Sequence, residues 1–147
     1  MADLDHRYMT PPSLRVSDRR KTPSGDEVVQ WDLRIAQPNV SHIAMPIVHS
    51  MEHFLGSYLR TRSELITTVA PMGCQTGFYI GAIGIGEFEP MADLLAEALE
   101  SVGAADRVPL ADPIQCGWAS NHTLEGVQRL AAWLLLRRGE WHQAGPL

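Results

Sequence analysis

The sequence predicts an α+β fold with two layers, in which an antiparallel-rich sheet packs against helices. Residues 28–35 alternate between apolar and polar side chains, which is typical of a half-buried strand. Residues 47–62 and 90–102 instead repeat apolar side chains at the spacing of an amphipathic helix. Strands and helices are mixed without the regular strand–helix–strand alternation of parallel sheets, and this favours the α+β class.

Turn and cap residues divide the chain into further elements. Residues 1–27 are rich in Pro, Asp and Arg and are predicted to form an irregular arm. Pro46 is well placed to begin the first helix, because proline is favoured in a first helical turn. Gly103 is a good stop for the second helix. The remaining predicted elements are strands at 65–69 and 78–85, a loop at 71–77, a mostly extended connection at 109–117, and a last helix that is capped by Thr123 and ends after Arg138 at Gly139.

Length and charge limit the classes of protein that this chain can represent. Its 147 residues predict a single domain over 1–147, which is long enough to bury a core without disulfides. The formal net charge is −5, and no basic face suited to nucleic acid is visible. The densest basic run, at residues 19–21, lies next to Asp18 and is predicted to be a solvated loop. We therefore expect no nucleic-acid partner.

The chain shows no signal for a membrane or for export. No segment approaches the roughly 20 apolar residues that a membrane-spanning helix needs. The polar N-terminus lacks the apolar core of a signal peptide, so we expect a cytoplasmic protein. In a reducing compartment, the two cysteines Cys74 and Cys116 are better suited to be a ligand or a nucleophile than to form a disulfide.

The most informative motif is HSMEH at residues 49–53. Residues four apart on an α-helix lie about 40° apart around its axis, so His49 and His53 can both reach one metal ion. Glu52 projects beside that ion, where it can exchange protons with whatever binds the metal. This HxxEH order is the reverse of HExxH and is known from the inverted zinc peptidases.

A catalytic metal site needs a third ligand and one open position, whereas structural sites are closed by four protein ligands. Cys116 is the natural candidate in the late part of the chain. Two histidines and a cysteine suit Zn(II), or Fe(II) in a reducing cytosol. The structural alternatives are core-facing histidines with Glu52 paired to Arg60 or Arg62, and Cys116 as a buried thiol.

The other cysteine lies in the loop PMGCQTG at residues 71–77. A nearby cation, a metal or unpaired backbone N–H groups would favour the thiolate of Cys74. The flanking glycines would let the backbone come close to a substrate. When this loop is considered alone, a small buried residue in a tight turn is an equally good interpretation.

Several sequence blocks together resemble the LuxS family, the S-ribosylhomocysteine lyases. Each block alone is weak to moderate, but they occur in the family order and span nearly the whole chain. The blocks are Leu4-Asp5-His6, Asp32-Leu33-Arg34 with Gln37-Pro38-Asn39, His49-Ser50-Met51-Glu52-His53, Pro71-Met72-Gly73-Cys74-Gln75-Thr76-Gly77, and Gln115-Cys116-Gly117 followed by His122 and Leu124-Glu125.

The resemblance implies a role for each of the chemically active residues. His49, His53 and Cys116 would bind one divalent metal per subunit, typically Fe(II), which Zn(II) or Co(II) can replace. Cys74 and Glu52 would be the two general acid/base groups. The fold would be the two-layered α/β fold of the family, in agreement with the pattern of predicted elements.

The resemblance also implies how the substrate is held. The family is a homodimer with two active sites at its interface. His6 and Arg34 align with residues that line the substrate pocket from the neighbouring subunit, and Arg60 aligns with an arginine near the amino-acid end of the substrate. The implied reaction moves a carbonyl along the ribose chain and then eliminates homocysteine, leaving dihydroxypentanedione, the precursor of an autoinducer.

Three positions depart from the family pattern. Met1 stands at the place of a serine, Thr68 at that of an aspartate, and Ala70 at that of a serine. These positions concern recognition of the substrate rather than the metal or the acid/base residues. A divergent paralogue that acts on another sugar thioether is therefore the first alternative.

Two further alternatives belong to other classes of protein. In a small HxxEH metallopeptidase, Glu52 would be the base, and a downstream carboxylate such as Glu97 or Glu125 would be the third ligand. That interpretation does not account for Cys74. A non-catalytic metal- or partner-binding module is the other alternative, and the presence of both Cys74 and Glu52 argues against it.

Overall fold

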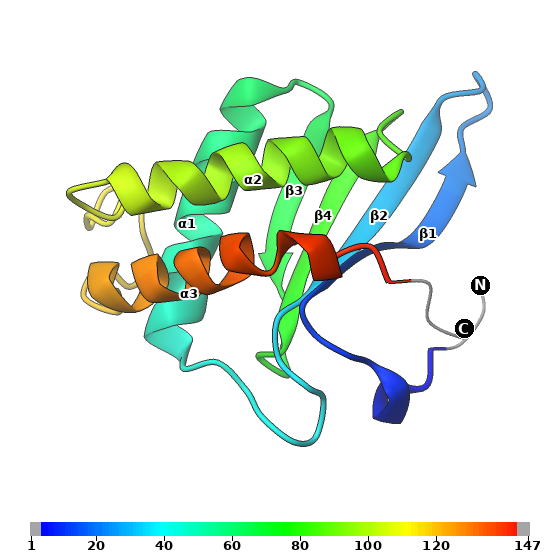
Figure 1. The fold of residues 1–147 in the computed structure, drawn as a ribbon. Helices are drawn as coiled ribbons and strands as arrows, with labels where there is room; N and C mark the ends of the chain where they lie inside the picture. Colours follow the sequence, from blue (N-terminus) through cyan, green and yellow to red (C-terminus); the bar gives the residue numbers. More distant parts are fainter. Residues whose placement is uncertain (1–3, 144–147) are drawn as a thin grey trace.

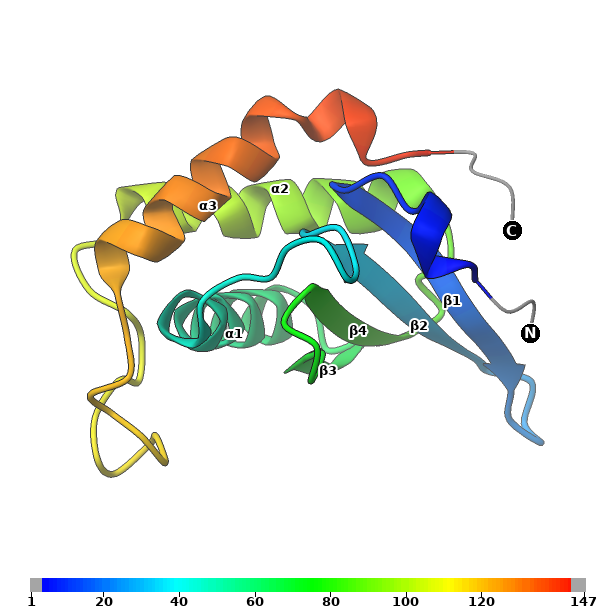
Figure 2. The ribbon, with the colours of Figure 1, turned by 90° about the horizontal axis from the view of Figure 1, so that it is seen from below.

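The computed structural model describes residues 4–143 and confirms the predicted α+β class. Its elements are the 3₁₀ turn η1 (His6–Tyr8), β1 (Ser13–Lys21), β2 (Glu27–Arg34), α1 (Met45–Arg62), β3 (Ile66–Pro71), β4 (Gly77–Ile83), α2 (Phe88–Ala104), α3 (Leu124–Leu136) and the 3₁₀ turn η2 (Arg138–Glu140). The strands form one antiparallel sheet in the order β1-β2-β4-β3. Both α2 and α3 lie over one face of this sheet, and α1 lies beside β3 (Figure 1, Figure 2).

Strand β2 lies at the centre of the sheet and confirms the strand predicted at residues 28–35. Val29, Trp31 and Leu33 alternate along it and are almost completely buried in the core beneath the helices. Asp32 and Arg34 point to the opposite face, yet both are also buried. At the C-terminal end of β2, the polar side chains are therefore buried and not exposed to solvent.

The prediction of an irregular arm at residues 1–27 is wrong over much of that range. Residues 13–21 form β1, which pairs with β2 along its full length. The apolar alternation is short, because Leu14 is the only buried apolar side chain of β1, Val16 is half-buried, and residues 18–21 are all charged. An edge strand of this kind is held by backbone hydrogen bonds to its neighbour. The side-chain pattern of the strand itself does not reveal these bonds. The basic run at 19–21 is solvated as predicted, but it lies in this strand and not in a loop.

Helix α1 confirms the helix predicted at residues 47–62 and carries the histidine motif. It begins at Met45, with Pro46 in its first turn. Val48 and Met51 are fully buried, whereas His49 and His53 are only half-buried. The apolar stripe of the helix thus fixes its rotation, and the two imidazoles project along the rim of the packed surface.

The remaining elements agree with the prediction to within a few residues at their ends. Thr123 caps α3, because its hydroxyl accepts a hydrogen bond from the backbone N–H of Gly126. The connection at 109–117 differs, since it is a series of turns and not an extended segment. It projects away from the sheet between α2 and α3 (Figure 2). None of the helices within residues 4–143 has the length and apolar character to cross a bilayer. Met1 lies outside these residues.

Candidate metal and active site

His49 and His53 lie one turn apart on α1, and both rings are held by backbone carbonyls. His49 Nδ1 donates to the carbonyl of Asn121 at 3.0 Å, and His53 Nδ1 donates to the carbonyl of Pro109 at 2.8 Å. Because a carbonyl only accepts, each Nδ1 carries the hydrogen and each Nε2 carries a free lone pair. This is the arrangement that orients histidine ligands in metal sites.

Cys116 reaches the same place from the connection between α2 and α3. The Asp112 carboxylate accepts hydrogen bonds from the N–H groups of Ile114 and Gln115, and its carbonyl accepts one from Cys116. These bonds form the turn that aims the thiol at α1. Cys116 Sγ lies 3.4 Å from His49 Nε2. The structure therefore brings together the three residues predicted as metal ligands.

A fourth donor, His122, joins this cluster. The ligand atoms of His49, His53, Cys116 and His122 all lie within 4.8 Å of one another. His122 belongs to one of the family-like blocks, but no spacing rule linked it to the metal helix. It is brought there because it directly precedes the N-cap of α3, whose first turn packs near Ser50 of α1.

Burial and the charges of its neighbours hold His122 in the neutral form. Burial is the larger cause, and repulsion from His49 and His53 adds to it, so the pKa of His122 falls to about 4. At neutral pH His122 therefore adds an uncharged imidazole to the cluster, which is the form that can bind metal.

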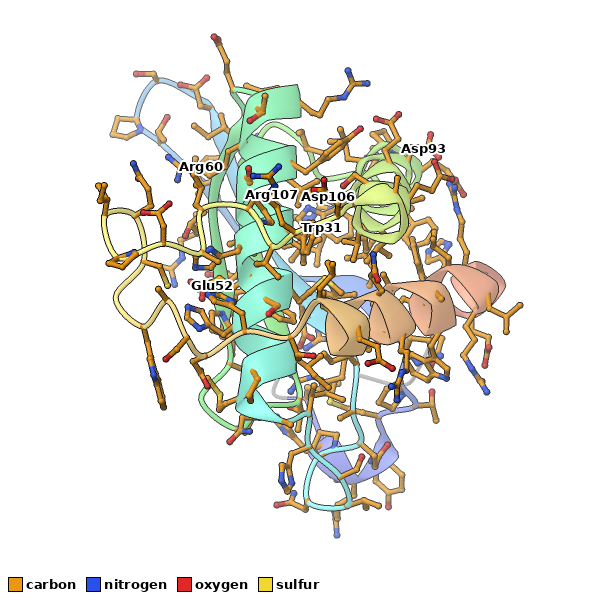
Figure 3. All side chains as sticks on the ribbon, turned by 90° about the vertical axis from the view of Figure 1, so that its left-hand side faces the viewer. Trp31, Glu52, Arg60, Asp93, Asp106 and Arg107 are labelled. Carbon is orange, nitrogen blue, oxygen red and sulfur yellow. The ribbon has the colours of Figure 1, made fainter. Side chains whose placement is uncertain are left out.

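Glu52 and Arg60 line a hollow next to the cluster. His53, Thr68 and Gln115 line the same hollow. Figure 3 shows Glu52 and Arg60 along one side of α1. Among residues 4–143, Glu52 has no ion pair, and Arg62 pairs with Glu97 instead. The alternative in which Glu52 merely pairs with Arg60 or Arg62 is therefore not observed.

Cys74 lines a different hollow, in the turn between β3 and β4. His6 and His42 line that hollow with it, and Cys74 itself is exposed. Cys74 is therefore not the small buried residue of the alternative interpretation, although Met72, Thr76 and Gly77 of the same loop are buried. Gly77 packs so closely on β2 that a Cβ would lie 2.3 Å from the carbonyl oxygen of Leu33.

The buried Arg34 is linked to the thiol of Cys74 through the hydroxyl of Thr76. Arg34 Nη1 donates to Thr76 Oγ1 at 2.7 Å, and Thr76 Oγ1 lies 3.0 Å from Cys74 Sγ. Arg34 is held in turn by Asp32 at 2.7 Å. Desolvation works to raise the pKa of the Cys74 thiol, but the hydrogen bonds with Thr76 and the charge of Arg34 outweigh it, so the net shift is downward.

The candidate residues thus fall into two groups within one chain. Glu52, Arg60 and the metal-binding cluster form the first group. The second group consists of Cys74 and His6, with Arg34 behind them. Within residues 4–143, no hydrogen bond joins Cys74 to any member of the cluster.

The carboxylate ligands that a peptidase would need do not reach the cluster. Glu97 pairs with Arg62, and Glu125 pairs with Arg129 on the surface of α3. The donors that do converge are imidazoles and a thiol, a set that can hold a borderline-soft divalent ion such as Zn(II) or Fe(II). The fold and the cluster together define a small α+β domain with a histidine and cysteine cluster that could hold a metal ion.

Comparison with known proteins identifies the family of this domain. The family described as S-ribosylhomocysteinase (LuxS) matches residues 2–144. An S-ribosylhomocysteine lyase of Helicobacter pylori is 41% identical over 143 residues, which cover 97% of this chain and 92% of the relative. Proteins of the same name from Chromohalobacter salexigens and Listeria monocytogenes are 40% and 39% identical, over 96% and 95% of this chain and 91% and 90% of theirs.

The chain belongs to the S-ribosylhomocysteinase family. The predicted family is thereby confirmed, and so is the predicted enzyme class, a carbon–sulfur lyase. A peptidase and a non-catalytic module are not supported.

Proposed function

We propose that this chain cleaves S-ribosylhomocysteine to homocysteine and dihydroxypentanedione. The observation that carries this proposal is the convergence of Cys116 on the two histidines of α1, with Glu52 lining the adjacent hollow. Membership of the family and the shared name of the relatives support the substrate. The products place the enzyme in the recycling of homocysteine and in the supply of an autoinducer.

The metal-binding residues in this proposal are His49, His53 and Cys116. Their donors fit one divalent ion, and we take Fe(II) as the native metal, with Zn(II) or Co(II) as replacements. When bound, such an ion acts as a Lewis acid that polarises a carbonyl oxygen and acidifies the neighbouring C–H.

Cys74 and Glu52 move the protons. The lowered pKa of Cys74 gives a thiolate that removes a proton from the carbon beside the carbonyl and returns it to the neighbouring carbon. Glu52 carries protons between the two oxygens, so that the carbonyl moves along the chain. In the last step, removal of the next proton breaks the C–S bond, and homocysteine leaves as a thiolate.

Three residues, His6, Arg34 and Arg60, hold the substrate. Arg60 lies in the same hollow as Glu52, where its guanidinium suits the carboxylate of the homocysteine part. Thr68 lines this hollow too, at the position where the family pattern has an acid. His6 lines the hollow of Cys74, and Arg34 acts on the thiol from behind through Thr76.

The active form in this proposal is a homodimer with its sites at the interface. The separation of the two residue groups supports it, because Cys74 and Glu52 line different hollows of one chain. Arg34 is linked to Cys74 through Thr76 within one chain. A neighbouring subunit that contributes Arg34 to an active site therefore contributes Cys74 to the same site. Each site would then combine the metal group of one subunit with the Cys74 group of the other.

The proposal treats residues 1–147 as one domain in a reducing cytoplasm. A single cluster of buried side chains joins β2, α1, α2 and α3, which supports one domain. Both cysteines are free, and both have chemical roles that oxidation would abolish.

The decisive experiment follows thiol release from S-ribosylhomocysteine by Co(II)- or Fe(II)-loaded protein. We expect the wild type to release homocysteine and Cys74→Ala to bind the metal at one ion per chain without turnover. If the wild type holds metal but releases no thiol, the substrate is wrong, and related sugar thioethers become the candidates.

A further inference from the structure

The hollow of Glu52 and Arg60 continues past Arg60 into a second hollow. The two hollows share four lining residues and so form one trough along α1: Gly56, Ser57, Arg60 and Leu110. His53 of the histidine and cysteine cluster lines one end of the trough, and Glu64, which follows the end of α1, lines the other. Glu52 and Arg60 mark its course along the helix (Figure 3).

The spacing of residues on α1 gives the trough a length. His53 and Arg60 are seven residues apart, which is close to two helical turns, so both project on the same side of α1. They are about 10 Å apart along the helix axis. In S-ribosylhomocysteine, the middle carbon of the ribose chain is joined to the carboxylate carbon by seven single bonds. At about 1.5 Å per bond, that chain covers most of this distance when it is extended.

Gly56 keeps the middle of the trough open. It is the one glycine inside α1, and it lies on the same side as His53 and Arg60, three residues after the first and four before the second. Glycine is unfavourable in a helix interior. Close packing does not require it here, because a Cβ at this position would meet no atom within 4 Å. The space it leaves suits the thioether chain of a substrate that runs from the cluster to Arg60.

The far end of the trough carries two opposite charges that do not pair with each other. Arg60 and Glu64 are exposed and line the same hollow, yet among residues 4–143 neither forms an ion pair. Helix α1 ends at Arg62 and the backbone becomes extended at Ser63, so Glu64 does not lie one helical turn after Arg60. A free cation and a free anion in one hollow suit a zwitterion, which carries a carboxylate and an ammonium group on one carbon.

Glu64 is the acid available for that ammonium group. Thr68 and Gln115, which line the trough near Arg60, are neutral. Within the described part of the chain, the other acid that lines the trough is Glu52, and the proposed function uses it to move protons next to the cluster.

We propose that Glu64 is a specificity-determining residue, which binds the ammonium group of the homocysteine part while Arg60 binds its carboxylate. This inference rests on the proposed function, because it assumes that the carbonyl of S-ribosylhomocysteine lies at the cluster. Glu64 then does the work of an acid at position 68, where this chain has Thr68. The trough selects a sugar thioether that ends in an α-amino acid.

An analogue without the amino group tests the role of Glu64. It carries S-linked 4-mercaptobutanoate in place of homocysteine and so retains the carboxylate. Glu64→Gln should raise KM for S-ribosylhomocysteine about 3- to 5-fold, the loss expected for an exposed charged contact. The value of kcat should stay the same, because the ammonium group is remote from the reacting carbons. For the analogue, Glu64→Gln and the wild type should have equal KM values.

Two further variants complete the experiment. Glu100→Gln is the matched control, since Glu100 is exposed on α2, forms no ion pair among the described residues and lines neither hollow. It should keep the wild-type KM for both compounds. Gly56→Leu should raise KM for both compounds, because its side chain enters the trough, and it should still bind one Co(II) per chain.

These outcomes separate the two proposals. If the wild type releases no thiol from S-ribosylhomocysteine, the proposed function fails, and the role of Glu64 fails with it. If the wild type is active but Glu64→Gln keeps the wild-type KM, or raises KM equally for the analogue, only the role of Glu64 fails. A wild-type KM in Gly56→Leu would place the substrate outside the trough and would also overturn that role.

Discussion

At the scale of single residues, polar contacts set the ionisation of the Cys74 thiol. Arg34 is buried and charged, and it does not touch Cys74 directly. Its effect passes through Thr76, whose hydroxyl both accepts from the guanidinium and can donate to the thiolate. The reactivity of Cys74 therefore depends on three side chains, one from β2 and two from the turn between β3 and β4.

Thr76→Val should reduce the reactivity of Cys74. It removes the hydroxyl that stabilises the thiolate, so the pKa of Cys74 should rise and a smaller fraction should be ionised at neutral pH. The pH profile of alkylation by iodoacetamide, recorded with Cys116→Ser as background, should move to higher pH. Thr76→Ser keeps the hydroxyl and should retain the wild-type profile; an equal shift in both variants would contradict this explanation.

At the scale of elements, α1 and the start of α3 bring the histidines of the cluster together, and each helix begins at a defined signal. Helix α1 presents two histidines on one side because its apolar stripe is buried on another. Helix α3 contributes through its start, since His122 directly precedes the N-cap. The turns at 109–117 then bring Cys116 between the two helices.

Thr123→Ala should destabilise the protein by about 1 kcal/mol, because it removes the hydroxyl that accepts from the first turn of α3. Urea unfolding followed by circular dichroism would measure this loss. Thr123→Ser retains the cap and should lose much less. Equal stability of the alanine variant and the wild type would mean that the cap contributes nothing here.

At the scale of the whole molecule, a bound ion would tie α1 to the connection between α2 and α3. His49 and Cys116 meet at the cluster although they are 67 residues apart in the sequence. A ligand that binds only the folded state stabilises it by about 2.7 kcal/mol at 100 times its dissociation constant.

Addition of Zn(II) to the metal-free protein should therefore raise the midpoint of thermal unfolding, and a chelator should reverse the change. Cys116→Ala should show little of this stabilisation, since it removes the thiolate ligand. Stabilisation of Cys116→Ala equal to that of the wild type would place the metal elsewhere.

A mixture of two inactive variants tests whether each active site combines residues of two subunits. His49→Ala lacks a metal ligand and Cys74→Ala lacks the base, so neither should act alone. If each site combines groups from two subunits, random exchange into dimers should restore about a quarter of the wild-type activity. An inactive mixture, with exchange shown by mass spectrometry, would place both groups of a site in one chain.

The helices, the inner strands and the HxxEH motif were predictable from the sequence because they depend on local periodicity. The convergence of the three residues predicted as metal ligands was foreseeable as well, since α-helical geometry places two of them together and cysteines are scarce. The edge strand β1 was not, because its pairing with β2 depends on backbone hydrogen bonds rather than on its own side-chain pattern.

The sequence by itself determined the α+β class, the helix that carries the two histidines, and the family, because each depends on residue types at short or ordered spacings. Only the tertiary structure decided that His122 lies in the cluster, that Ser50 holds it, and that Arg34 acts on Cys74 through Thr76. It also decided that Cys74 and Glu52 line different hollows. The physical reason is that these contacts join segments far apart in the chain, and the packing of α1, α3 and the sheet sets the distances between them.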